Sequence, residues 1–307
     1  MLGWLSLTGP TSTGPVSTTD RLFRVCFALF TASIVFSLAG TLVLQLIPSA
    51  TGFFAPYMES LIKAPTWTYM AMLPLLTFLL YLPVLGWGRS VGFLLVGSLI
   101  GAAAELAGTT TGLPFGPYMY TTWLGAKIAG HVPWFIPPSW YAVSVVCYDL
   151  AQRMRFGTVG TLVGGALLMV IWDVALDPAM SKAFPFWIYP ATVPPALADT
   201  FVADAFGWLF VGVFFGMPLM NWVGWFVTSL LIMLAYRYLF GGIPEEGGDA
   251  RYPWAAAFFA LNMIFPMFVS LLYGVPRAAF IGALALVAPF VLIRLRREDE
   301  TPAPIPA

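Results

Sequence analysis

Two aspartates four residues apart are the side chains in this sequence best suited to acid–base chemistry. Asp173 and Asp177 fall in an apolar run, WDVALDP, and this spacing puts them on one face of a continuous helix. Two close carboxyl groups resist joint ionisation, and a low-dielectric setting strengthens that resistance. One of the pair is therefore expected to keep its proton near neutral pH and to act as a general acid. The structural alternative is that Asp177-Pro178 only ends the helix, while Asp173 bonds a neighbouring helix.

A glutamate and an asparagine from two other apolar segments should reach the same depth as this pair. Glu105 lies near the end of one segment and Asn221 at the start of another. An ionisable group in the membrane costs on the order of 3 kcal/mol, so such groups are usually functional. The convergence predicts a site in which Asp173 is the favoured acid and Asp177 its ionised partner. Glu105 would be an alternative base or a positioning group, and Asn221 would help to hold a water molecule.

Aromatic side chains are concentrated next to these polar groups. The segment TGLPFGPYMY after Glu105 contains Phe115, Tyr118 and Tyr120, while Trp172 precedes Asp173 and Trp225 follows Asn221. Such rings can line a flat apolar substrate and stabilise a cation beside it. The sequence contains no dinucleotide loop, P-loop or zinc motif, and its single histidine cannot form a metal site. We therefore expect neither a cofactor nor a metal.

The elements that position these residues are predicted to be membrane-spanning helices. Of 307 residues, 60% are hydrophobic and 9% are charged, against about 25% charged in a soluble domain. Basic and acidic residues balance at 14 each, which gives no reason to expect a nucleic-acid partner. The chain is thus expected to be an all-α, polytopic bundle of about eight spans, with seven to nine possible. The segments are 24–47, 66–85, 90–107, 134–152, 157–177, 222–239, 254–273 and 276–293.

The distribution of basic residues predicts the orientation. Eight spans with both termini cytoplasmic place ten of the 14 Lys and Arg residues on the inner side, whereas a ninth span at 200–217 would give six inside. The apolar segment 200–221 is therefore expected to be interfacial or re-entrant, with a ninth span less favoured. One membrane domain, 21–297, should lie between a polar tail at 1–20 and a disordered tail at 298–307.

Three of these segments resemble a known family. ELAGTTTGLPFGPYMY (105–120), WDVALDP (172–178) and GMPLMNWVGW (216–225) are similar, in this order, to motifs of the carotenoid 1',2'-hydratases of the CruF type, which include the bisanhydrobacterioruberin hydratases. The resemblance covers essentially the whole membrane region, although 181–215 is less similar. It adds Thr111 to the expected substrate-binding residues.

The resemblance implies cofactor-free addition of water to the terminal double bond of an acyclic (ψ) carotenoid end, in a prokaryotic cytoplasmic membrane. Carotenoid, water and lipid would be the partners, and the oligomeric state stays open. Protonation would give a tertiary cation that water captures as a tertiary alcohol.

A carotenoid end-group cyclase is the first alternative to this function. A membrane prenyltransferase is less favoured because few basic residues lie on the outer side, and a non-enzymatic lipid transporter would need polar groups at several depths.

Overall fold

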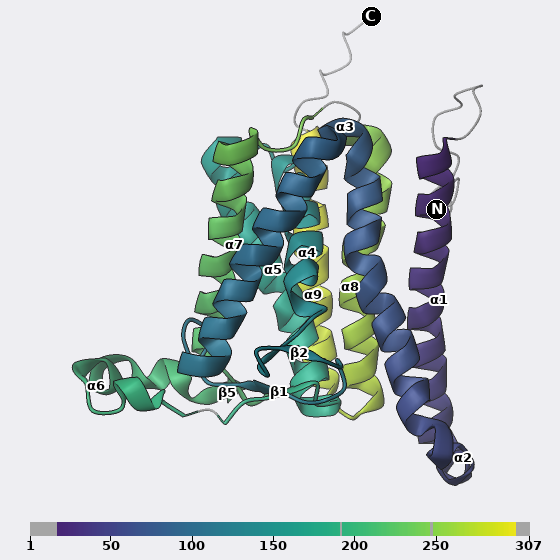
Figure 1. Ribbon diagram of the computed structural model, residues 1–307, viewed down its shortest axis with the longest axis vertical. Helices are drawn as coiled ribbons and strands as arrows, with labels where there is room; N and C mark the ends of the chain where they lie inside the picture. The colour runs from purple at the N-terminus through teal and green to yellow at the C-terminus, as the bar shows by residue number, and fades with distance from the viewer. Residues whose placement is uncertain (1–16, 191, 246–247, 299–307) are drawn as a thin grey trace, which may run out of the picture.

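The computed structural model describes residues 17–190, 192–245 and 248–298 and has the architecture of a helical bundle (Figure 1). The predicted all-α class is confirmed. The helices are α1 (Thr18–Leu46), α2 (Pro48–Phe54), α3 (Met58–Thr111), α4 (Ile136–Gln152), α5 (Gly157–Asp177), α6 (Phe201–Phe206), α7 (Leu219–Phe240), α8 (Gly248–Leu272) and α9 (Pro276–Glu298). Most of both predicted tails, 1–16 and 299–307, lies outside the described residues, and α1 already begins at Thr18.

Within the described residues, six helical runs are long and apolar enough to cross a membrane. They are Thr18–Leu46, Pro48–Thr111, Gly157–Lys182, Leu219–Phe240, Gly248–Leu272 and Pro276–Arg296. The second run reverses direction within α3, and Figure 1 shows its two arms on either side of the turn. Gly86 makes this reversal with φ 69° and ψ 168°, a conformation that a residue without Cβ adopts at little cost.

Helix α4 forms the centre of the bundle. It packs mainly against α3 and α5, and its residues from Ser139 to Ala151 are all buried. Helix α1 lies at the edge of the bundle (Figure 1), beside α3 and α8. Its last buried residue is Ile34. The interior is therefore built by the later helices, while α1 presents most of its surface outward.

Short antiparallel ladders gather at one end of the bundle (Figure 1). They pair β1 (Met119–Tyr120) with β4 (Trp187–Ile188), β2 (Lys127–Ile128) with β3 (Val132–Pro133), and β5 (Gly212–Phe214) with β6 (Met217–Pro218). The β1–β4 ladder sets Tyr120 opposite Trp187. It thereby joins the long loop after α3 to the segment after α5.

The apolar segment 200–221 forms no spanning helix. It consists of α6, a 3₁₀ turn at Gly207–Phe210, the β5–β6 hairpin and the first turn of α7. Figure 1 shows α6 beside the bundle, at the end that carries the ladders. Phe201 is 75% exposed and Trp208 59% exposed. Such aromatic side chains are typical of a segment that lies at a membrane interface.

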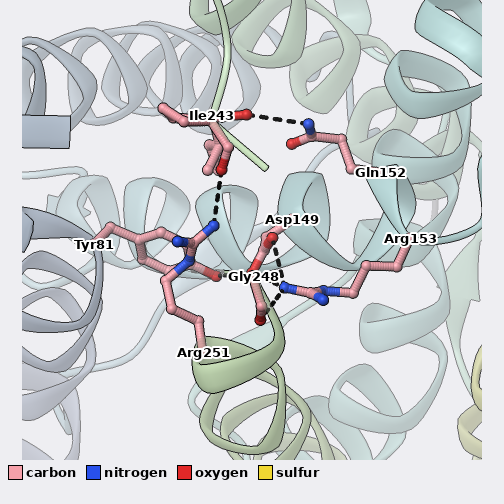
Figure 2. Close-up of polar contacts among 8 residues, drawn as sticks. Tyr81, Asp149, Gln152, Arg153, Ile243, Gly248 and Arg251 are labelled. Atoms are coloured by element: carbon pink, nitrogen blue, oxygen red, sulfur yellow. Dashed lines mark hydrogen bonds and ion pairs between the residues drawn. The ribbon is translucent and has the colours of Figure 1, made fainter. Parts of the chain in front are cut away.

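A separate polar cluster surrounds Asp149 (Figure 2). Tyr81 Oη donates to Asp149 Oδ2 at 2.9 Å, and Arg153 Nη2 lies 3.2 Å from Asp149 Oδ1. The same Arg153 nitrogen donates to the carbonyl of Gly248 at 2.7 Å. These bonds satisfy the buried Asp149 carboxylate and tie α3, α4 and the start of α8 together. The burial of the Asp149 carboxylate is therefore explained by its role in joining these helices.

Candidate active site

One cavity of about 110 Å³ contains most of the residues singled out in the sequence. Its wall includes Glu105 from the end of α3, Asp173 from α5 and Asn221 from α7. All three are buried. The structure thus brings together two of the three carboxyls and the amide that were expected to meet at one depth.

Glu105 is surrounded by hydrogen-bond donors. Tyr118 Oη donates to Glu105 Oε2, Tyr120 Oη donates to the same oxygen at 2.8 Å, and Trp140 Nε1 donates to Oε1 at 2.9 Å. Donors of this kind satisfy an ionised carboxylate, which can only accept hydrogen bonds. This environment therefore favours Glu105 as a fixed negative charge in the cavity wall.

The phenols that hold Glu105 are themselves kept protonated by their surroundings. Burial and the neighbouring Glu105 charge raise the pKa of Tyr118 and Tyr120 well above the ordinary value for tyrosine. Burial and the nearby Asp177 and Asp173 likewise raise the pKa of Tyr189. All three phenols consequently remain donors across the physiological pH range.

Asp173 has a different environment. Asn221 Nδ2 donates to Asp173 Oδ2 at 2.9 Å and also lies 2.9 Å from the sulfur of Met217. One hydrogen bond, from Asn221, holds this buried carboxyl, and the unbonded Trp222 indole nitrogen lies near it, whereas three hydrogen bonds hold Glu105. A carboxyl group with a single donor on one oxygen can carry a proton on the other. Asp173 is thus the better suited of the two cavity carboxyls to donate a proton.

Asp177 lies behind the cavity wall. Trp187 Nε1 donates to Asp177 Oδ1 at 2.6 Å, and Tyr189 Oη donates to the same oxygen at 3.2 Å. Asp177 is buried but does not line the cavity, whereas Trp187 and Tyr189 do. The helix continues beyond Asp177 as a π-helical turn, Pro178–Ala183. Asp177 therefore contacts the cavity wall through these two aromatic residues, and it also lies one helical turn from Asp173 on α5.

Three tryptophans form an aromatic wall between the carboxyls. Trp140 and Trp225 stack with ring centroids 4.3 Å apart at 27°, and Trp172 meets Trp225 edge-on at 5.7 Å. Trp172 is fixed by a 3.2 Å hydrogen bond from Nε1 to the carbonyl of Asn262. Their π faces offer an apolar surface that also tolerates positive charge.

Phe115 completes the same wall, and the position of its ring depends on two glycines. It is buried on the cavity and packs so closely that a Cβ at Gly224 would lie 2.4 Å from its ring. A Cβ at Gly108 would lie 2.7 Å from the ring. Both glycines are therefore needed for the loop after α3 to pack against α3 and α7.

Besides Asp177, the structure separates a second predicted residue, Thr111, from the cavity. Thr111 is exposed at the end of α3, its hydroxyl donates to the carbonyl of Ala107 and it accepts from the amide of Leu113. It stabilises the helix end, and its contact with a substrate stays a prediction. Phe115, Tyr118, Tyr120, Trp172, Asn221 and Trp225 all line the cavity.

Sequence reasoning missed several aromatic residues of the site, among them Trp140, Trp187 and Tyr189, which bond its carboxyls. Trp187 and Tyr189 alternate along FWIY, a spacing that sends both to one side of a strand. This alternation is a signal that could have found them. Trp140 lies in a largely apolar helix, next to another aromatic residue, Tyr141, so no feature of the sequence distinguishes it. Among the described residues, no group of three or more His, Cys, Asp or Glu side chains is placed to hold a metal.

Comparison with known proteins gives a consistent result. Residues 66–289 match a family described as carotenoid biosynthesis proteins. A bisanhydrobacterioruberin hydratase from Haloarcula japonica is 28% identical in an alignment of 223 residues that covers 69% of this chain. The match covers 65% of that relative, so this chain spans just under two-thirds of its length. No solved structure matches the chain.

Proposed function

The chain belongs to the carotenoid biosynthesis protein family, and from this premise we propose that it hydrates an acyclic carotenoid end group. The reaction adds water across the terminal C1',2' double bond and gives a tertiary 1'-hydroxy carotenoid. The 28% identical relative named as a hydratase supports this reaction class. The observation that carries the proposal is the pair of cavity carboxyls, Glu105 held by three donors and Asp173 by one.

The first step uses the proton of Asp173. Its transfer to the less substituted alkene carbon forms a C–H bond and leaves a tertiary cation on the other carbon. The faces of Trp140, Trp172 and Trp225 stabilise this cation, and the fixed charge of Glu105 adds to that stabilisation. No basic side chain lines the cavity in the described part of the chain, which disfavours a diphosphate substrate.

The second step uses a water molecule in the same cavity. Its oxygen forms a C–O bond to the cation and loses one proton to a carboxylate. We assign this acceptor to Glu105, because Asp177 lies behind Trp187 and Tyr189. The side-chain nitrogen of Asn221 donates a hydrogen bond to Asp173. Its side-chain oxygen can accept a hydrogen bond from the water. Return of the proton to Asp173 restores the starting state, with one water added.

Conversion of a pigment tests this function. In a host that makes lycopene or γ-carotene, the chain should yield a pigment heavier by one water for each hydrated end. An end-group cyclase would instead give an isomer with unchanged mass. Unchanged pigment from a chain that is present in the membrane would contradict both activities.

We further propose eight membrane crossings with both termini in the cytoplasm of a prokaryotic cell. The reversal at Gly86 lets residues 58–85 and 87–111 cross separately. Helix α4 has 17 residues, about 26 Å at 1.5 Å per residue, and it crosses among longer helices that shield it. Reporter fusions after Arg155 and at the C-terminus should both report cytoplasm. A C-terminus on the outer side would contradict this topology.

A further inference from the structure

The cavity is too small for a whole carotenoid. Its volume is about 110 Å³, whereas an apolar cavity of about 150 Å³ binds a molecule the size of benzene. The site therefore holds roughly one isoprene unit, the end group that reacts. The remaining polyene chain must leave the cavity through its wall, and this requirement rests on the function proposed above.

The wall nearest the edge of the bundle comes from α1 and the first arm of α3. Ser33, Ile34 and Ser37 of α1 line the cavity together with Pro65 and Thr66 of α3. Ser37 and Thr66 are half-buried, whereas Glu105 and Asp173 are buried. Since α1 is the edge helix in Figure 1, the cavity approaches the outer surface of the bundle on this side.

The hydroxyl groups on this wall do not offer protons to a ligand. Ser33 donates to the carbonyl of Phe30, Ser37 to that of Ser33, and Thr66 to that of Ile62. With their donors used inside their own helices, these small side chains form a narrow face of low polarity. A hydrocarbon chain can lie along such a face without displacing a required hydrogen bond.

The same face of α1 continues into open space. Ser33, Ser37 and Gly40 follow one another at helical spacing, and a Cβ added at Gly40 would meet no atom within 4 Å. In α1, no residue after Ile34 is buried. Aromatic contacts fix only the first half of the helix, where Phe23 and Phe27 pack on Trp254.

We propose that the polyene chain of the substrate passes from the cavity into the lipid between α1 and the first arm of α3, along Ser33, Ser37 and Gly40. The end group then enters from within the bilayer, and the far end of the carotenoid stays in lipid. The substrate class for this passage is a slender acyclic polyene.

A tryptophan in the passage tests the proposal. Ser37→Trp should lower conversion of an acyclic carotenoid at least tenfold more than conversion of a short isoprenoid alkene with the same end group. Gly40→Trp should do the same. Val35→Trp is the matched control, because Val35 lies on the same helix and is 58% exposed. It should change neither rate.

Pigment that copurifies with the protein provides a readout independent of turnover. Bound carotenoid should fall in Ser37→Trp and Gly40→Trp and stay normal in Val35→Trp, even if the pigment is not hydrated. If the unaltered chain does not hydrate the carotenoid, the proposed function is refuted. The differences in bound pigment would still support the passage. Equal binding in all variants, or an equal loss of long and short substrates, would overturn the passage.

Discussion

Asp173→Asn should abolish hydration while the protein still inserts and folds. The amide keeps the shape of the side chain but has no proton acidic enough to transfer to an alkene. General acid catalysis contributes about 10²–10⁴-fold, and conversion should fall by at least this factor. Pigment analysis in a lycopene-producing host measures the loss, and the amount of protein in the membrane fraction corrects for expression.

The control for this variant is a carboxyl remote from the cavity. Asp204 on α6 is exposed, so Asp204→Asn removes the same chemical group without touching the site. It should keep full conversion. Asp177→Asn should leave weak activity with a shifted pH profile, because the Asp177 carboxyl does not line the cavity but lies one helical turn from Asp173 and interacts electrostatically with it. An Asp173→Asn protein that makes hydroxylated carotenoid at a near-normal rate would refute Asp173 as the acid.

Glu105→Gln should be nearly as damaging, for a different reason. The substitution removes the negative charge beside the cation, and its NH₂ group would face donors from Tyr118, Tyr120 or Trp140. Loss of one preorganised electrostatic group typically costs about 10²–10³ in rate. A buried donor left without an acceptor also costs about 1–3 kcal/mol of stability. Conversion and thermal unfolding of the purified variant should therefore both decline.

Tyr118→Phe distinguishes the effect of the Glu105 charge from the effect of a hydrogen bond to it. This variant removes one donor but leaves the carboxylate with Tyr120 and Trp140, so its loss of activity should be much smaller than that of Glu105→Gln. A Glu105→Gln protein with normal conversion would exclude Glu105 as proton acceptor and cation stabiliser. If Glu105→Gln were inactive and Asp173→Asn active, the acid would belong to α3.

The helices were predictable because lipid requires long apolar segments. The segment expected at 157–177 coincides with α5, and the one expected at 222–239 lies within α7. The segment expected at 66–85 began too late, since α3 already starts at Met58 and continues through Pro65. A proline within a spanning helix is tolerated when neighbouring groups satisfy the freed backbone, and the sequence does not show those neighbours.

The site residues were predictable where a polar side chain occurs in an apolar segment. Glu105, Asp173 and Asn221 stand out in apolar helices, and all three line one cavity. The alternation of Trp187 and Tyr189 could have placed both rings on one side, but their bonds to Asp177 were not predictable, because the β1–β4 ladder that positions them pairs residues far apart in the sequence. Thr111 was selected by its motif alone, and its hydroxyl instead bonds the end of α3.

The most direct measurement of the proposed chemistry is the origin of the atoms added during pigment conversion. Purified protein supplied with an acyclic carotenoid in H₂¹⁸O should give a product with one ¹⁸O atom in each new hydroxyl group. In D₂O, the product should carry one deuterium on the adjacent carbon. A cyclised isomer that gains deuterium but no oxygen, or a hydroxyl group without ¹⁸O, would contradict hydration at this site.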